Sequence, residues 1–558
     1  MTTTTAGPWL ARGAVVVVVV SAYANSLTGP FIFDDLRGIV TNPNIRTLLP
    51  PASLTAPAGT GASGRPVVAF SLAVNHAVGG LNVAGYHVLN VAIHLGCALA
   101  LLATVQRGLR MPRVPAHLRE QALPIAAGVA LVWAAHPLNT DALNHVISRS
   151  EALLALFFLL TLYGFFRSVE AGSSPGWAVA SMVCNALGMA SKEAMAAAPL
   201  VVLLADRALV SGDFTAALRA RWRLYAGLAG GWIILAACVL SGDRGASVGL
   251  EAGGYTSVSY AMTQVVVVAH YLRLAAWPVP LVLDYGTWPT GESVNLLLVA
   301  APIVGGALLL TVVLLWRNHG VGVPAAAFLL VLAPSSSFVP LSGEVTAEHR
   351  MYLPLAAVVL IAVLALAAML RRAGRRAADA VIVCVGVGLA TAGAWATIRR
   401  NEVYGTAESI WMDSLKHRPE NARAYAQLGQ VYLDARAYDR ALSALSEAVR
   451  LAPTRGDIRR NYGAALLQLG RFDQAVTELK TAVELAPRDA LARFNLGAAL
   501  AQVGRLREAA EQFEAGLAIE PRDVRAHAAL ADVLERRGNL TKAEEHRRRA
   551  EELGHKRR

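Results

Sequence analysis

Apolar and polar positions divide the chain into two regions. Up to about residue 400, runs of about 20 mainly apolar residues recur, which is the length that a helix needs to cross a bilayer. Beyond residue 420, charged residues separate the apolar positions. We expect about eleven spans, at residues 10–27, 86–106, 122–136, 151–167, 176–190, 194–210, 222–241, 294–316, 321–340, 352–370 and 378–398. The pattern predicts an all-α protein in which a polytopic membrane bundle precedes a soluble helical domain.

A 34-residue repeat organises the soluble region. Small or turn-forming residues return at this interval, as in Pro419, Pro453, Pro487 and Pro521, and in Gly429, Gly463 and Gly497. Glycine where two helices meet closely, and proline where a helix pair ends, are typical of tetratricopeptide repeats. We therefore expect a membrane domain at 1–400, a linker helix at 401–420 and an α-solenoid of about four repeats at 421–558, the last repeat being a polar cap.

Two apolar stretches need separate interpretation. Residues 258–277 contain Gln264, His270 and Arg273, so we expect an amphipathic helix at the surface or against the bundle, with a twelfth span as the alternative. The first apolar run resembles a signal peptide, but it has no convincing cleavage site and more spans follow it. We expect this run to be retained as the first span.

Charge indicates how the membrane domain is oriented. The formal net charge is +12, and arginines cluster after every second span, as in Arg107, Arg110, Arg207, Arg371 and Arg375. Cytoplasmic loops are enriched in such residues. The basic balance is therefore an orientation signal, and we expect no nucleic-acid partner. The same alternation places the repeats on the opposite, extracytoplasmic side, although Arg399 and Arg400 lie there against the rule.

The opposite loops carry the candidate chemistry. Asp34 and Asp35 are adjacent directly after the first span. Neighbouring carboxylates repel each other, so one of them is suited to act as a general base or to bind a metal ion. The alternative is an ordinary turn, because Asp and Asn are common turn residues.

Further polar motifs stand at the same predicted face. A lipid phosphate could be held by isolated cations such as Lys192 and Arg350, since a guanidinium matches phosphate geometry. Each motif alone also fits a helix end, a neutralised turn or an interfacial anchor. The full set of candidate binding residues is Arg65, His87, His136, Asp141, Arg149, Lys192, Glu193, Glu348, His349 and Arg350.

Several familiar chemistries are excluded. The chain has no Walker loop, no nucleophile elbow and no convincing zinc pattern, and its four cysteines lie in apolar runs as small core residues. Together, two adjacent aspartates, several histidines and isolated cations on one face fit a reaction between a phosphate-bearing lipid and an acceptor hydroxyl.

The order of the motifs resembles one known family. Phe31-Ile32-Phe33-Asp34-Asp35, Arg65-Pro66, Gly85–Asn90, His136-Pro137, Ser148–Glu151, Ser191-Lys192-Glu193 and Glu348–Pro354 precede the repeats. This arrangement is similar to the transmembrane and tetratricopeptide repeat-containing protein O-mannosyltransferases, which are GT-C glycosyltransferases. The resemblance covers almost the whole chain.

The resemblance implies an activity. It implies inverting transfer of a sugar, mannose in the family, from a polyprenyl-phosphate donor to Ser or Thr of an extracytoplasmic protein. Asp34 or Asp35 would be the catalytic base, with a divalent metal ion as an optional cofactor, and the repeats would bind the acceptor. The expected location is a bacterial inner membrane, or the endoplasmic reticulum in a eukaryote. The alternative is a non-catalytic, membrane-anchored repeat scaffold or assembly factor.

Overall fold

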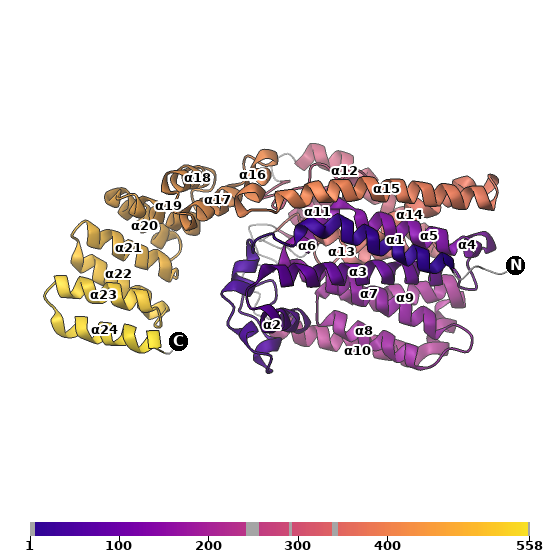
Figure 1. Cartoon of the computed structure of the whole chain (residues 1–558), viewed down its shortest axis with the longest axis horizontal. Helices are drawn as coiled ribbons and strands as arrows, with labels where there is room; N and C mark the ends of the chain where they lie inside the picture. Colours follow the sequence, from indigo (N-terminus) through magenta and orange to yellow (C-terminus); the bar gives the residue numbers. More distant parts are fainter. Residues whose placement is uncertain (1–5, 242–255, 290–292, 338–343, 556–558) are drawn as a thin grey trace. The chain divides into compact units, whose positions relative to one another are not determined.

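The computed structural model consists of helices joined by loops (Figure 1), and it describes residues 6–241, 256–289, 293–337 and 344–555. The chain divides into two compact units, Met1–Thr406 and Ala407–Arg558. We call them the membrane unit and the repeat unit. The described residues contain helices and no strand, so the predicted all-α fold is confirmed.

The membrane unit contains fifteen of the α-helices in the described part of the chain. They are α1 (Ala6–Tyr23), α2 (Pro66–Gly79), α3 (Val83–Gly108), α4 (Ala116–Glu120), α5 (Ala122–Ala135), α6 (Thr140–Asn144), α7 (Arg149–Ser168), α8 (Gly176–Met189), α9 (Ala198–Asp206), α10 (Phe214–Ser241), α11 (Ser257–Ala276), α12 (Ser293–Trp316), α13 (Gly322–Leu332), α14 (Pro354–Met369) and α15 (Arg375–Val403). Short 3-10 turns connect them, among them η5 (Pro137–Asn139), η6 (Val146–Ser148), η7 (Glu193–Ala197) and η11 (Glu348–Met351).

Eight helical segments of the described residues are long and apolar enough to cross a membrane, or nine if one bent pair counts as a single span. Each of the eleven predicted apolar runs contains a helix, although residues 338–340 of one run lie outside the described residues. Helix α9 reaches the length of a span only together with the turns on either side of it, and three other helices are short. Helices α8 and α13 have 14 and 11 residues. The third, α5, ends at His136-Pro137, where the chain bends by 55°. The length of an apolar run therefore indicates a buried or lipid-facing helix, but it does not indicate at which residue that helix ends.

Residues 257–276 fold against the bundle as α11, in agreement with one of the two predicted placements. One face of α11 is buried, including Tyr260, Val267 and Tyr271, and the helix packs against α12 and α14. It is not among the candidate spans.

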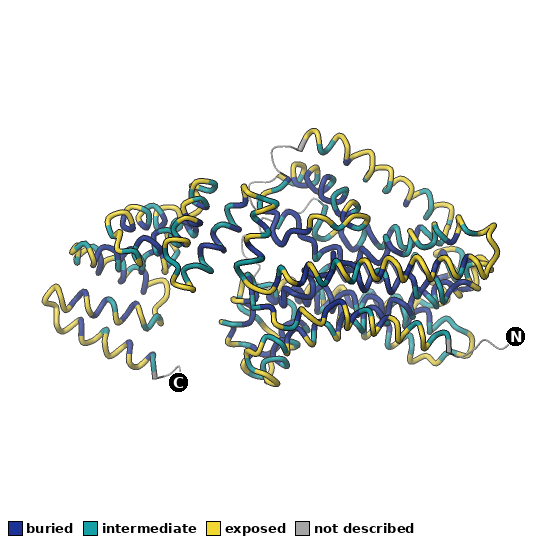
Figure 2. The backbone as a smooth tube through the Cα atoms, turned by 45° about the horizontal axis from the view of Figure 1, so that its top comes forward, coloured by how far each residue is buried: buried dark blue, intermediate teal, exposed yellow. Residues whose placement is uncertain are grey.

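Close helix contacts form the core of the membrane unit. Helix α7 packs against α3 and α8, and α5 packs against α15. Glycine allows the second contact, because a Cβ on Gly386 would lie 3.0 Å from the Cα of Gly128. Buried residues fill the interior, while exposed apolar residues cover outer helices such as α12 and α15 (Figure 2). Exposed apolar surface of this extent is expected of a surface that faces lipid.

Up to residue 555, where the described part of the chain ends, the repeat unit contains nine helices: α16 (Ala407–His417), α17 (Ala422–Asp434), α18 (Tyr438–Leu451), α19 (Gly456–Gln468), α20 (Phe472–Leu485), α21 (Ala490–Gln502), α22 (Leu506–Ile519), α23 (Val524–Arg536) and α24 (Leu540–His555). From α17 onward, consecutive helices pair as tetratricopeptide repeats do. The repeating glycines sit where the two helices of a pair meet, since a Cβ on Gly463 would lie 2.5 Å from Leu479 Cγ.

Candidate polar site

Polar residues from four separate segments meet at one end of the membrane helices. The first loop contributes Asp34 and Asp35, and the segment from α6 to the start of α7 contributes Asp141, His145 and Glu151. Lys192 precedes η7, and η11 supplies His349. Helices α3, α7 and α14 begin at this end and α15 finishes there, so chain topology alone aligns these groups.

Asp35 is fully buried and organises the first loop. Its Oδ1 accepts a hydrogen bond from Ile147 N at 2.7 Å, and its Oδ2 accepts bonds from Val146 N at 3.2 Å and Ile32 N at 3.3 Å. Burial raises the pKa of the carboxyl group, while His145 and these backbone donors act against that rise. Asp35 therefore holds the first loop against η6, and its oxygens are directed at protein groups.

Asp34 has a different environment, because it is only half-buried. Its neighbour Phe33 has a positive φ of 50°, which marks the sharp turn in which the acidic pair stands. Of the two adjacent carboxylates, Asp34 is therefore the more accessible one.

The acidic pair does not fit a shared metal ion. Three backbone N–H groups occupy the oxygens of Asp35. Within the described residues, no group of three or more His, Cys, Asp or Glu side chains could hold a metal ion. We therefore assign no chemical step to a metal.

His145 links the first loop to the rest of the site, although the sequence motifs did not single it out as a site residue. Its Nε2 lies 3.8 Å from Asp35 Oδ1 and is buried without a hydrogen-bond partner, while Nδ1 contacts Ser148 Oγ at 3.1 Å. The imidazole also interacts electrostatically with Asp141. In the sequence, the only indication of a role for His145 was its position in a polar loop, directly after Asn144.

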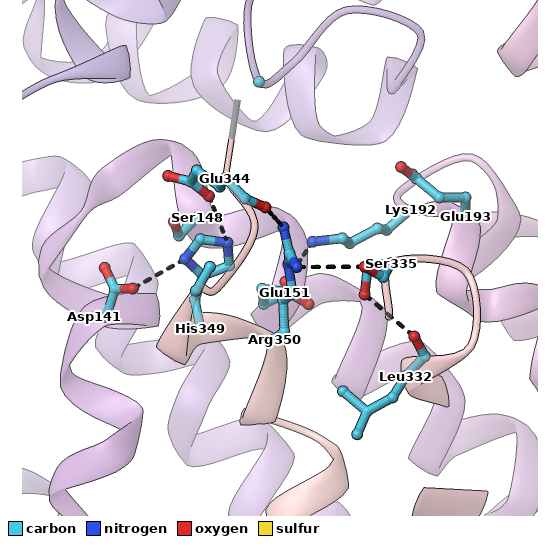
Figure 3. Close-up of polar contacts among 12 residues, drawn as sticks. Asp141, Ser148, Glu151, Lys192, Glu193, Leu332, Ser335, Glu344, His349 and Arg350 are labelled. Atoms are coloured by element: carbon cyan, nitrogen blue, oxygen red, sulfur yellow. Dashed lines mark hydrogen bonds and ion pairs between the residues drawn. The ribbon is translucent and has the colours of Figure 1, made fainter. Parts of the chain in front are cut away.

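Asp141 and His349 form the centre of the site (Figure 3). His349 Nδ1 lies 2.9 Å from Asp141 Oδ2, and His349 Nε2 lies 3.7 Å from Glu344 Oε2. Burial would lower the pKa of His349, but Asp141 outweighs this effect and the pKa is raised. The two carboxylates therefore favour the protonated form of the imidazole.

Glu348 is buried beside this pair. Its Oε1 accepts hydrogen bonds from Val282 N at 2.6 Å and from the Tyr285 hydroxyl at 2.7 Å. Burial raises the pKa of Glu348 to about 7. The site therefore contains a carboxyl group that titrates near neutral pH.

Lys192 and Arg350 approach the same region but differ in availability (Figure 3). The Arg350 guanidinium donates hydrogen bonds to the carbonyls of Ser335 at 3.3 Å, Val345 at 3.1 Å and Glu344 at 2.5 Å. Lys192 forms an ion pair with Glu151, and its side chain remains 14% exposed. The lysine is therefore the more accessible cation, and the arginine acts mainly as a structural tie.

Arg65 and Glu193 pair with each other. Arg65 Nη2 lies 3.1 Å from Glu193 Oε1, and Arg65 Nη1 donates to the Gly61 carbonyl at 2.6 Å. This ion pair joins the start of α2 to η7. Lys192 is thereby held next to a neutralised carboxylate.

Three other candidate residues have structural partners. Arg149 is fully buried and donates to Asn90 Oδ1 at 2.6 Å, to Ser71 and to the Tyr86 carbonyl. His136 Nε2 lies 3.2 Å from the Ala275 carbonyl, and His87 Nε2 lies 3.0 Å from the Gly29 carbonyl. Their contacts connect helices around the site and leave little surface for a ligand.

Arg400 is one of the two arginines that lie on the predicted extracytoplasmic side, against the enrichment of arginine in cytoplasmic loops. The residue is 9% exposed at the end of α15, and it interacts electrostatically with Asp141 and Glu348. A cation that compensates buried acids carries no information about membrane orientation.

Two family models, both described as tetratricopeptide repeat, match the repeat unit. One matches residues 432–503, and the other matches residues 399–455 and 499–555. A solved structure described as the crystal structure of MamA protein is 25% identical, with a TM-score of 0.26, and the match covers 28% of this chain and 86% of that one. The predicted repeats are confirmed by the family models.

Curated relatives confirm the resemblance that the motif order indicated. The human protein O-mannosyl-transferase TMTC4 is 29% identical over 212 residues, which are 33% of this chain and 28% of the relative. The human protein O-mannosyl-transferase TMTC1 is 23% identical over 498 residues, which are 79% of this chain and 55% of the relative. The chain thus spans at most about half the length of these relatives.

Proposed function

We propose that this protein is an integral-membrane glycosyltransferase. It moves a sugar, mannose by analogy with the relatives, from a polyprenyl-phosphate donor to a Ser or Thr hydroxyl of an extracytoplasmic protein. One observation carries the proposal: four segments that are distant in sequence bring carboxylates, imidazoles and a lysine together at one end of a membrane bundle. Polar groups at bilayer depth are costly, and their concentration at one place is typical of function.

An apolar cavity supports a lipid donor. A cavity of about 310 Å³ lies between α3, α7, α9, α13 and α14, and apolar side chains form most of its lining. Leu353 and Pro354 line it near the polar site, and Arg113 and His319 line it near the other end of these helices. A hydrocarbon tail could lie in this cavity while its phosphate reaches Lys192 and His349.

Asp34 is our candidate for the base. It accepts the proton of the acceptor hydroxyl as the hydroxyl oxygen bonds to the anomeric carbon. The bond between that carbon and the phosphate oxygen breaks, and polyprenyl phosphate leaves with the electron pair. Lys192 and the His349 cation stabilise the negative charge that develops on the phosphate. Asp35 positions the first loop, and Asp141 keeps His349 protonated.

The repeat unit supplies the contact with the acceptor protein in this proposal. Tetratricopeptide repeats commonly mediate protein–protein interactions, and their stacked helices create an extended surface. The arginines of the membrane unit favour a location of the polar site and the repeats outside the cytoplasm. The membrane would be a bacterial inner membrane, or the endoplasmic reticulum in a eukaryotic cell.

A complementation experiment tests the proposal. Cells that lack the gene receive wild-type protein, Asp34→Asn, or Asp213→Asn as a matched control. Asp213 is exposed, and it accepts a hydrogen bond from Ala216 N at the start of α10. Asn caps a helix as well as Asp does. Mass spectrometry of extracytoplasmic proteins then measures hexose on Ser and Thr.

We expect wild type and Asp213→Asn to restore the hexose, and Asp34→Asn to restore little of it. Full restoration by Asp34→Asn at equal protein level would overturn the assignment of the base. Full restoration by the repeat unit on an unrelated anchor would instead support the scaffold alternative.

A further inference from the structure

Three aromatic rings cluster beside the polar site: His270 on α11, and Tyr285 and Trp288 in the loop that follows this helix. Trp288 lies with its ring centroid 4.8 Å from that of His270 and 5.6 Å from that of Tyr285. The His270 and Tyr285 rings meet edge to face at 5.4 Å, and His270 Nε2 lies 3.1 Å from the Tyr285 hydroxyl. Tyr285 is buried and Trp288 is half-buried, so the other two rings support an indole that retains open surface.

One hydrogen bond joins this cluster to the candidate site. The Tyr285 hydroxyl donates to Glu348 Oε1 at 2.7 Å, and Glu348 directly precedes His349 in η11. All recorded hydrogen bonds of Glu348 involve Oε1. In the part of the chain that the structure describes, the Oε2 atom of this buried side chain has no hydrogen-bond donor.

Tryptophan near a membrane surface is often only an interfacial anchor. The same loop contains such a residue for comparison. Trp277 is 69% exposed and has no ring partner among the described residues. Trp288 differs in both respects, because it is half-buried and is held by two rings that connect to a buried carboxylate.

We propose that Trp288, supported by Tyr285 and His270, binds the sugar ring of the donor, and that Glu348 Oε2 accepts a hydrogen bond from one of its hydroxyls. A hexose presents an apolar face of C–H groups and a rim of hydroxyls. Aromatic surface with a few well-placed polar atoms complements such a ligand. This inference rests on the proposed function. It adds a sugar subsite that contains Glu348, the residue directly before His349, whose imidazole is proposed to contact the phosphate.

Steady-state kinetics of purified full-length protein in lipid nanodiscs provide the first test. The donor is polyprenyl-phosphate mannose and the acceptor is a Ser/Thr peptide. We expect Trp288→Leu to raise the donor KM about tenfold and to change kcat by less than about twofold. Trp288→Phe keeps a ring and should stay within about threefold of wild type. Trp277→Leu is the matched control and should not change KM.

A binding measurement separates the subsite from the catalytic proposal. Saturation-transfer NMR with methyl α-mannopyranoside detects contact between aromatic and sugar protons without any turnover. We expect transfer in wild type, Trp277→Leu and Trp288→Phe, and its loss in Trp288→Leu.

The outcomes are distinguishable. Wild-type protein that shows this contact but transfers no hexose would refute the proposed function and keep the subsite. An active wild type whose KM and saturation transfer are the same in Trp288→Leu and Trp277→Leu would overturn the subsite alone. If Trp288→Leu unfolds, Tyr285→Phe decides, because it removes the hydroxyl that donates to Glu348 Oε1. Wild-type saturation transfer and an unchanged donor KM in this variant would count against the proposal.

Discussion

The two units use the same charged residue types in opposite ways. In the repeat unit, many ion pairs lie at the surface between neighbours in the chain, as in Arg505 with Glu508 and Arg450 with Glu447. At the polar site of the membrane unit, the charged groups are buried or half-buried and their partners are distant in sequence. His349 and Asp141 are separated by 208 residues, and Arg65 and Glu193 by 128.

This difference indicates where a substitution will matter. An exposed ion pair contributes little, because water solvates each partner when the other is removed. A buried charge that loses its partners retains the full cost of desolvation. The polar groups of the membrane unit should therefore be individually important, and those of the repeat unit individually replaceable.

The largest expected effect on stability is at Arg149. Replacing Arg149 with Met leaves Asn90 Oδ1 without its donor and removes the bonds from the guanidinium to Ser71 and to the Tyr86 carbonyl. We expect a loss of about 3–5 kcal/mol in unfolding free energy. Thermal unfolding followed by tryptophan fluorescence reports on this unit, because nine of the ten tryptophans lie in it. Arg399→Met is the control, since Arg399 is 63% exposed. Equal midpoints for the two variants would refute the comparison.

Glu348 predicts a pH dependence of stability. Its pKa in the folded protein is about 7, against 4.5 for an unperturbed glutamate. Between these values the folded state binds more protons than the unfolded state, so stability decreases as pH rises from about 4.5 to 7. The expected change is of the order of 3 kcal/mol.

Glu348→Gln should remove this contribution. We expect a flatter dependence of the unfolding midpoint on pH in this window, measured with the same fluorescence signal. His349 also has a raised pKa. It would still cause a loss of stability in Glu348→Gln as pH rises above 6.5. A slope identical to that of wild type would show that Glu348 is not the titrating group.

In the repeat unit, packing should matter more than charge. The Gly463→Ala substitution places a methyl group 2.5 Å from Leu479 Cγ, so either the Leu479 side chain or the two helices α19 and α20 must shift. We expect a net destabilisation of about 1–2 kcal/mol, because overpacking exceeds the better helix propensity of alanine. Hydrogen exchange of the full chain should show faster exchange in peptides from these two helices, and protection equal to wild type would contradict the expectation.

The smallest effect is expected at Arg505. Its partner Glu508 is three residues away on an exposed surface. Arg505→Gln should leave hydrogen exchange in α22 unchanged at physiological salt. A clear loss of protection would mean that the ion pairs of the repeat unit contribute more than their exposure suggests.

The sequence predicted the repeat unit closely because its information is local. Gly429, Gly463 and Gly497 mark each helix contact at a fixed interval, and each pair depends mainly on its neighbours. The apolar runs likewise identified the membrane helices. The break at His136-Pro137 was harder to predict, because an apolar run can continue across a bend.

Individual roles in the polar site could not be predicted, because they depend on long-range contacts. Asp34 and Asp35 are equivalent as a motif, yet three backbone donors from η6 and the first loop bind only Asp35. Arg149 and Arg350 were both candidate binding residues, but their donors are directed at protein groups. The contact between His145 and Asp35 depends on how the first loop packs against η6, so the sequence did not indicate it.

The central claim is that the membrane unit performs the chemistry and that Asp34 is its base. The most direct measurement is the initial rate of hexose transfer from polyprenyl-phosphate mannose to a Ser/Thr peptide by purified full-length protein. We predict that Asp34→Asn lowers this rate at least about a hundredfold at an unchanged unfolding temperature, with Asp213→Asn at the wild-type rate. A wild-type rate from folded Asp34→Asn protein would contradict the account.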